Sequence, residues 1–134
     1  MTAVSTDGVG KDYNGRTVLE AVSMAVPEGR CVALIGHNGA GKTTLMKLIL
    51  GVVRPTRGHV EVLGHDPVAA GVDFRSYLGF LPENVSFHDQ MTGTDTLIFF
   101  ARLKNVDTSE AIELLDRVGL ARAADQKVKT YSKG

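Results

Sequence analysis

The chain has 134 residues, of which 43% are hydrophobic and 22% charged, a composition typical of one soluble globular domain and unlike a disordered or fibrous chain. Its 15 Lys and Arg balance its 15 Asp and Glu, so no overall field attracts nucleic acid, and an anionic ligand needs a local site. The sequence lacks the ~18 consecutive apolar residues of a membrane span and the apolar run of a secretory signal. We therefore expect a soluble protein without a nucleic-acid partner.

Two strands are predicted in the first third of the chain. Within residues 18–26, Val22 and Met24 alternate with polar or small neighbours, the pattern of a half-buried strand. Residues 31–35 form a continuous apolar run, which is expected of a strand covered on both faces. Cys31, the single cysteine, is interpreted as a buried small hydrophobic residue of that strand, and one cysteine excludes an internal disulfide.

Helix and strand then alternate. A helix is predicted over residues 43–50, because Leu45 and Leu48 recur at helical spacing and glycine follows. Short strands are predicted over residues 60–62 and 78–81. This alternation favours an α/β core with a parallel sheet.

Three further helices are predicted from their first residues. Asp66–Pro67 combines a capping aspartate with proline at the first helical position. Thr92–Asp95 has the spacing of a capping box ahead of an apolar run. Asp107 begins the last helix, whose apolar stripe comprises Ala111, Leu114, Leu115 and Val118.

Residues 36–43 read GHNGAGKT and match G-x-x-x-x-G-K-[ST], the P-loop pattern, between a predicted strand and a predicted helix. Glycines let backbone N–H groups approach phosphate oxygens at a helix N-terminus, where an anion is favoured. Lys42 supplies a charge for the β- and γ-phosphates, and the Thr43 hydroxyl is a ligand for Mg²⁺. The alternative is a glycine-rich turn with a surface lysine.

The histidines do not have the spacing of a metal site. His37 stands at a variable position of the loop and is interpreted as a filler. His59, His65 and His88 have no Cys or carboxylate at ligand spacing, so we interpret them as exposed or capping residues.

The stretch ALIGHNGAGKTTLMKLILGVVRPTRGHVEVLG resembles the ATP-binding cassette family, including Thr44 after the motif and the turn at residues 55–58. KDYNGRTVLEAVSMAVPEGR is similar to the first β-subdomain of that family. The resemblance implies ATP and Mg²⁺ as ligands, and it places Tyr13 where the family has an aromatic residue that stacks on adenine. The alternative for Tyr13 is an exposed turn residue. The implied ATP-binding set comprises Tyr13, Gly36, His37, Asn38, Gly39, Ala40, Gly41, Lys42, Thr43 and Thr44.

YLGFLPENVSF falls where the family has its Q-loop, with Glu83 at the usual glutamine position. The resemblance implies that Lys42 and Glu83 are catalytic and that Thr43 and Glu83 hold Mg²⁺. A carboxylate can approach the metal or the attacking water, but it donates no hydrogen bond when ionised. The alternative is a solvated loop carboxylate.

Residues 131–134, YSKG, are similar to the start of the family's signature motif, in which Ser132 and Gly134 would donate to the γ-phosphate on the opposite subunit. The Walker B aspartate, the catalytic glutamate and the switch histidine are expected beyond Gly134. The segment alone is therefore predicted not to hydrolyse ATP.

The resemblance implies an α/β P-loop NTPase core of the cassette type, with an N-terminal antiparallel β-subdomain and the start of the helical subdomain before Walker B. Residues 1–82 would form the β-subdomain and P-loop core. Residues 83–134 would form the Q-loop and part of the helical subdomain of the same nucleotide-binding domain.

LGFLPENVSF, ARLK, DRVGLARAAD and KVKTYSKG are similar to the cytoplasmic ATPases of copper-processing transporters that serve nitrous-oxide-reductase maturation. This implies a head-to-tail homodimer, an integral-membrane permease as partner and a peripheral position at the inner face of the plasma membrane. The apolar surface of residues 94–104 is interpreted as core packing, with permease docking as the alternative. The alternatives in function are a non-hydrolysing nucleotide-binding fragment, an exporter ATPase for another substrate, and a cassette ATPase of DNA repair or translation.

Overall fold

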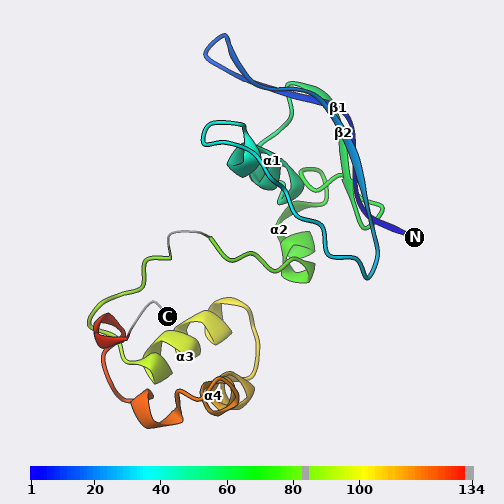
Figure 1. The fold of residues 1–134 in the computed structure, drawn as a ribbon. Helices are drawn as coiled ribbons and strands as arrows, with labels where there is room; N and C mark the ends of the chain where they lie inside the picture. Colours follow the sequence, from blue (N-terminus) through cyan, green and yellow to red (C-terminus); the bar gives the residue numbers. More distant parts are fainter. Residues whose placement is uncertain (83–84, 132–134) are drawn as a thin grey trace. The chain divides into compact units, whose positions relative to one another are not determined.

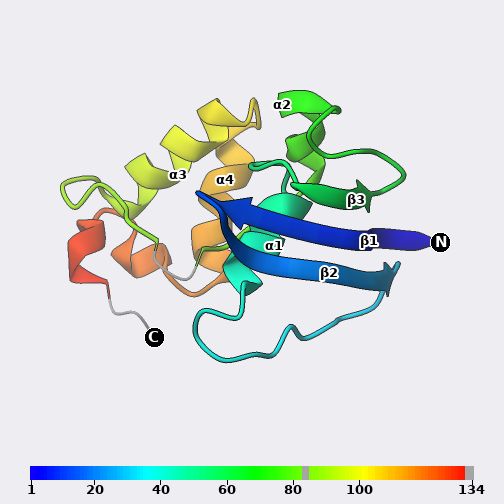
Figure 2. The same cartoon turned by 90° about the horizontal axis from the view of Figure 1, so that it is seen from above.

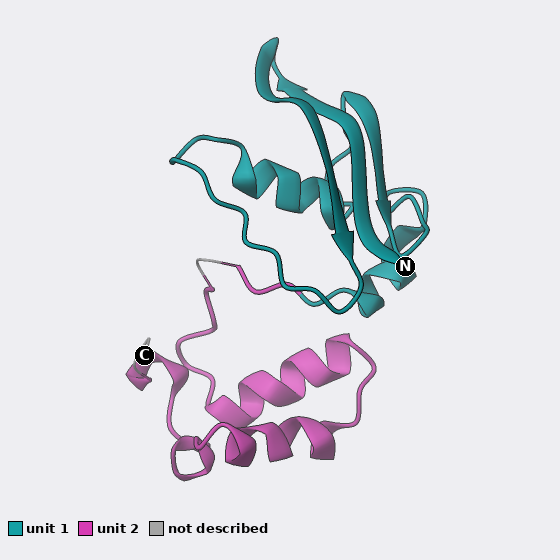
Figure 3. Cartoon of the chain, turned by 45° about the vertical axis from the view of Figure 1, so that its right-hand side comes forward, with its two compact units in different colours: residues 1–79 teal, residues 80–134 magenta. Residues whose placement is uncertain are grey.

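The structure is a computed structural model that describes residues 1–82 and 85–131. It divides into two compact units, Met1–Gly79 (unit 1) and Phe80–Gly134 (unit 2), coloured separately in Figure 3. Within the described ranges, each helix is too short or too polar to cross a bilayer. The assignment of residues 1–82 and 83–134 to parts of one nucleotide-binding domain stays a prediction.

Unit 1 is built on a three-stranded antiparallel sheet in the order β2-β1-β3 (Figure 1). The strands are β1 (Thr2–Tyr13), β2 (Arg16–Pro27) and β3 (Arg57–Val62). The strands predicted over residues 18–26 and 60–62 are confirmed, and both are longer than expected. Asn14 and Gly15 join β1 to β2 with φ values of 49° and 78°, the left-handed backbone that a tight two-residue hairpin turn requires.

Helix α1 (Lys42–Ile49) packs on one face of this sheet and closes the core of unit 1 (Figure 2). Val9 and Leu48 are fully buried, and Leu45 is nearly so. Burying each such side chain stabilises the fold by about 1.5–3 kcal/mol. The predicted helix over residues 43–50 is confirmed, and its packing fixes the loop that precedes it.

Two predicted strands do not form. Residues 31–35 and 78–81 have no regular secondary structure, and Ile35 is 90% exposed and Leu81 83%. A strand needs a neighbour that exchanges backbone hydrogen bonds with it, and no described segment pairs with either run. Cys31 is exposed rather than buried. The prediction of a parallel sheet is therefore wrong for the described residues, because their sheet is entirely antiparallel.

The helix predicted to begin at Asp66–Pro67 begins later, as α2 (Gly71–Phe74). Asp66 does act as a cap, because its carboxylate accepts the N–H groups of Val68 at 2.8 Å and Ala69 at 3.2 Å. These bonds, first that from Val68, hold the pKa of Asp66 below its ordinary value of 3.8. The segment that Asp66 caps, residues 67–70, is a turn. The predicted position of the helix start is therefore wrong. Short 3-10 helices are found at Arg75–Tyr77, Ala121–Ala123 and Val128–Thr130.

Helices α3 (Gly93–Leu103) and α4 (Thr108–Arg117) form the body of unit 2. The predicted capping box is confirmed: Thr92 Oγ1 accepts the Asp95 N–H at 3.0 Å, and the Asp95 carboxylate accepts the Thr92 N–H at 3.2 Å. Hydrogen bonding by the Thr92 side chain, and next by its backbone, lowers the pKa of Asp95. Asp107 caps α4 as predicted, accepting the Ser109 N–H at 2.7 Å.

Only part of the predicted apolar stripe on α4 is buried. Ala111 and Leu115 are buried, whereas Leu114 is 43% exposed and Val118 66% exposed. The helix packs on α3, and one neighbouring helix covers a narrower face than the four positions span. The prediction is therefore correct for the centre of the stripe and wrong for its edge.

The segment after α4 returns to the beginning of α3. The Gly93 N–H donates to the Gln126 carbonyl at 3.3 Å, and the Tyr131 hydroxyl donates to the Ala123 carbonyl at 2.5 Å. A Cβ added at Gly93 would collide with the Tyr131 hydroxyl. Tyr131 is therefore hydrogen-bonded to the segment after α4 and lies close to Gly93, the first residue of α3.

Candidate functional site

The loop at residues 36–41 leads directly into α1 and projects from unit 1 (Figure 1). Gly39 and Gly41 have φ values of +86° and +89°, which residues with a side chain rarely adopt. The Ala40 N–H donates to the His37 carbonyl at 3.1 Å and closes a tight turn. The loop therefore presents backbone groups to solvent at the beginning of a helix, although the strand predicted before it is absent.

Lys42, the first residue of α1, folds back across this loop. Its Nζ donates to the carbonyl oxygen of Gly36 at 2.5 Å and to that of His37 at 2.8 Å. Phosphate oxygens accept stronger, charge-assisted hydrogen bonds than neutral carbonyls do. The ammonium is therefore placed where an anion cradled by the loop can exchange with these carbonyls.

Gly41 is the point at which the loop contacts the sheet. A Cβ at this position would lie 2.6 Å from Leu19 Cδ2 and 2.8 Å from the Val18 carbonyl oxygen. Leu19 lies opposite Lys11 in the ladder between β1 and β2. Because Gly41 has no side chain, the loop can pack closely against Val18 and Leu19 of β2, near the β1–β2 turn.

Among the other loop residues, Thr43 is exposed on the first turn of α1 and Thr44 is half-buried. His37 Nδ1 lies 2.8 Å from the Asn38 carbonyl oxygen, a local contact within the loop. Across residues 1–82 and 85–131, no group of three or more His, Cys, Asp or Glu side chains could hold a metal ion. The role of the Thr43 hydroxyl as a ligand for Mg²⁺ stays a prediction.

Tyr13 is the last residue of β1, and 41% of it is exposed. The Nζ atom of Lys11 lies 4.9 Å from the centroid of its ring. The ring belongs to the same unit as the loop, and Lys11 is connected to Gly41 through Leu19 across the ladder. Tyr13 therefore keeps exposed surface for a planar ligand in the unit that also contains the loop.

Glu83, Ser132 and Gly134 lie outside the described residues. Their predicted contacts with Mg²⁺ and with a γ-phosphate therefore stay predictions.

The described loop fits a nucleotide phosphate chain. The first turn of α1 contains no acidic side chain, so its free N–H groups and helix dipole favour an anion without competition. The glycines leave the loop backbone open on the solvent side, because a Cβ at Gly39 would meet nothing within 4 Å. Lys42 adds the positive charge.

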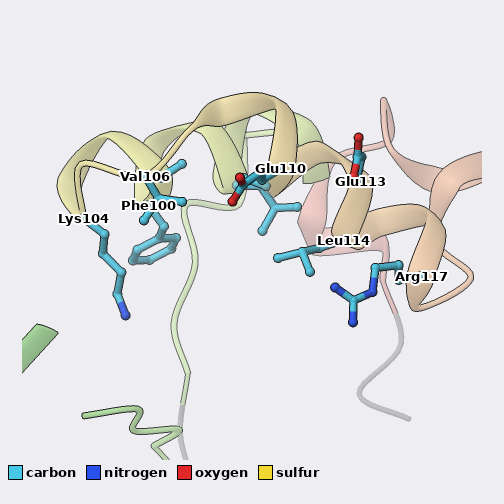
Figure 4. A pocket seen from close by; sticks show the side chains of 10 residues that line it. Phe100, Lys104, Val106, Glu110, Glu113, Leu114 and Arg117 are labelled. Atoms are coloured by element: carbon cyan, nitrogen blue, oxygen red, sulfur yellow. The ribbon is translucent and has the colours of Figure 1, made fainter. Parts of the chain in front are cut away.

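Unit 2 contains a groove of about 590 Å³ that we did not predict. Its lining comprises Leu97, Phe100, Ala101, Lys104, Val106, Glu110, Ala111, Glu113, Leu114 and Arg117. Figure 4 shows Lys104 and Arg117 at opposite ends of the groove, whose lining also contains apolar side chains and the two acidic residues Glu110 and Glu113. The signal for it in the sequence is the stripe of α4, which is wider than the face that α3 covers.

The sequence profile of the ABC transporter family matches residues 19–134. The daunorubicin resistance ATP-binding protein DrrA3 of Streptomyces coeruleorubidus is 34% identical over 99% of this chain and 43% of its own length. The uncharacterized ABC transporter ATP-binding protein YdbJ of Bacillus subtilis is 35% identical over 96% of this chain and 42% of its own length. The chain thus spans less than half the length of these curated relatives.

Comparison with solved structures also matches the chain to ATP-binding proteins of ABC transporters. The structure of an ATP binding subunit of an ABC transporter matches with a TM-score of 0.82 and 29% identity, covering 98% of this chain and 57% of the other. An ABC transporter ATP-binding protein from Pyrococcus furiosus matches with a TM-score of 0.78 and 26% identity, covering 98% and 64% respectively.

Proposed function

Since the chain belongs to the ATP-binding cassette (ABC) transporter family, we propose that it supplies the ATP-binding site of a transport ATPase. The observation that supports this most directly is the loop before α1, with Lys42 folded across it within 2.8 Å of two loop carbonyls. A charged donor above exposed backbone at a helix N-terminus is suited to a triphosphate.

In this proposal the loop binds ATP through its backbone N–H groups, and Lys42 binds the β- and γ-phosphates. The Thr43 hydroxyl holds Mg²⁺, which neutralises phosphate charge when bound. Tyr13, 41% of which is exposed, stacks on adenine. The proposed ATP-binding residues are Tyr13, Gly36, His37, Asn38, Gly39, Ala40, Gly41, Lys42, Thr43 and Thr44.

For the whole protein we propose ATP hydrolysis in a head-to-tail homodimer bound to a membrane permease at the inner face of the plasma membrane. Lys42 and Glu83 act at the γ-phosphate, with Glu83 also near Mg²⁺. Ser132 and Gly134 contact nucleotide on the opposite subunit. Residues 1–82 and 83–134 are then parts of a single nucleotide-binding domain.

The test is a titration of the protein at its natural length with a fluorescent ATP analogue. Lys42→Ala removes one charge-assisted contact of about 1.5–3 kcal/mol, so affinity should fall about tenfold to a hundredfold. Lys47→Ala, which removes an exposed lysine from the same helix, is the matched control and should bind normally. Equal ATP affinities of Lys42→Ala and Lys47→Ala would show that the loop does not bind ATP.

The finer proposal concerns the cargo. The resemblance of four short segments supports a copper- or sulfur-related role in nitrous-oxide-reductase maturation. The relatives named for daunorubicin or doxorubicin resistance support export of another substrate instead. A strain lacking the gene distinguishes the two roles. Low copper in nitrous-oxide reductase with normal drug tolerance would support the maturation role. Drug sensitivity with a normally copper-loaded reductase would support export of another substrate.

A further inference from the structure

Lys11 is anchored beside the exposed ring of Tyr13. Its Nζ lies 4.9 Å from the ring centroid and also donates to the Arg54 carbonyl oxygen at 2.7 Å. We propose that Lys11 is a positioning residue that holds the Tyr13 ring in place for adenine. The inference rests on the adenine-stacking role of Tyr13 in the proposed function.

The end of β1 is tied to the turn before β3 at successive residues. The Thr56 N–H donates to the Gly10 carbonyl at 2.8 Å, and the Asp12 N–H donates to Thr56 Oγ1 at 3.0 Å. Arg57 donates to both carboxylate oxygens of Asp12, at 2.9 and 3.3 Å. Lys11 therefore extends from a fixed backbone to a fixed acceptor, and its ammonium has a defined position.

This position affects the ring. The β1–β2 ladder is irregular at Lys11, so it is the side-chain contact itself that places the ammonium over the ring, and Tyr13 still keeps 41% of its surface exposed. The ammonium attracts the negative face of the aromatic ring and restrains its rotation. A restrained ring loses less conformational freedom when a ligand stacks on it.

Lys11 also lies near the phosphate loop in the fold. It is opposite Leu19 in the ladder, and Leu19 is the residue that a Cβ at Gly41 would strike. A lysine in this neighbourhood has an alternative role, direct contact with phosphate. The two roles predict different results for a ligand without adenine. If Lys11 acts through Tyr13, replacing it should not change the binding of such a ligand. If Lys11 contacts phosphate directly, replacing it should weaken that binding too.

The experiment compares ATP with inorganic triphosphate by isothermal titration calorimetry, using the protein at its natural length. Lys11→Met should weaken ATP binding about two- to fivefold, the range of an exposed cation–π contact. Triphosphate binding should not change. Lys11→Arg, which keeps a cation and a donor, should restore most of the affinity, and Lys129→Met, an exposed lysine of unit 2, is the control.

The double variant identifies the route of the effect. On a Tyr13→Ala background, Lys11→Met should cause no further loss of ATP affinity. An additive loss, or an equal loss for triphosphate, would overturn the positioning role. If Tyr13→Ala alone leaves ATP affinity unchanged, the stacking assignment fails; if only Lys11→Met has no effect, the positioning role fails alone. Lys11→Gln carries the same expectations and replaces Lys11→Met if that variant melts early.

Discussion

Replacing Gly41 by alanine should be among the most damaging single substitutions in unit 1. Its φ of +89° costs a residue with a side chain about 1–2 kcal/mol. The new Cβ would also lie 2.6 Å from Leu19 Cδ2 and 2.8 Å from the Val18 carbonyl oxygen, and overpacking of this kind costs about 1–3 kcal/mol. The expected loss is about 2–5 kcal/mol, against a usual total stability of about 5–15 kcal/mol.

Gly39→Ala is the matched comparison. Its φ of +86° is nearly the same, but a Cβ there would meet nothing within 4 Å. Only the backbone cost of about 1–2 kcal/mol should appear. The difference between the two variants therefore isolates the contact between the loop and β2.

The assay is urea unfolding of both variants in the protein at its natural length, with the free energy of unfolding extrapolated to water. Gly41→Ala should lose about 1–3 kcal/mol more than Gly39→Ala. Equal losses would refute the reasoning, because they would mean that the loop does not rest on Leu19 in solution.

Three other predictions concern unit 2 and turnover. Tyr131→Phe should lower the stability of unit 2 by about 0.5–1.5 kcal/mol in urea unfolding, because the bond to the Ala123 carbonyl is lost. Thr92→Ala should cost about 1 kcal/mol at neutral pH. The folded-state pKa of Asp95 lies below its ordinary value of 3.8. The ionised carboxylate therefore stabilises the fold above pH 3.8, and this stabilisation is lost as the pH falls through the folded-state pKa. In Thr92→Ala, the free energy of unfolding should depend less on pH in this acidic range. Residues 1–134 alone should release no phosphate from ATP, and release at the rate of the natural-length protein would contradict the placement of Walker B beyond Gly134.

The sequence predicted part of the fold, from local patterns and from the family resemblance. The fold class is confirmed by the antiparallel sheet and helices and by the match to a solved ATP binding subunit with a TM-score of 0.82. The capping box at Thr92 and the strand alternation near Val22 depend on neighbours in sequence, so they could be interpreted without tertiary structure. The P-loop pattern likewise identified the loop and α1.

The errors arose where an element depends on distant partners. The run at residues 31–35 has strand composition, but nothing in its own sequence supplies hydrogen-bond partners. Leu114 belongs to a helical stripe, yet its exposure is set by how much of α4 the facing helix covers. The anchoring of Lys11 by the Arg54 carbonyl joins residues far apart in sequence and has no sequence motif.

The order of strands in the sheet has a consequence for synthesis on the ribosome. β1 is made first but lies in the middle of the sheet, between β2 and β3. Its hairpin with β2 can form soon after Pro27 emerges, whereas its other edge stays unpaired until residues 57–62 are available. At about 5–20 residues per second this interval lasts a few seconds. The nascent chain therefore exposes an open strand edge, a site for pairing with other chains, for longer than a local hairpin takes to fold.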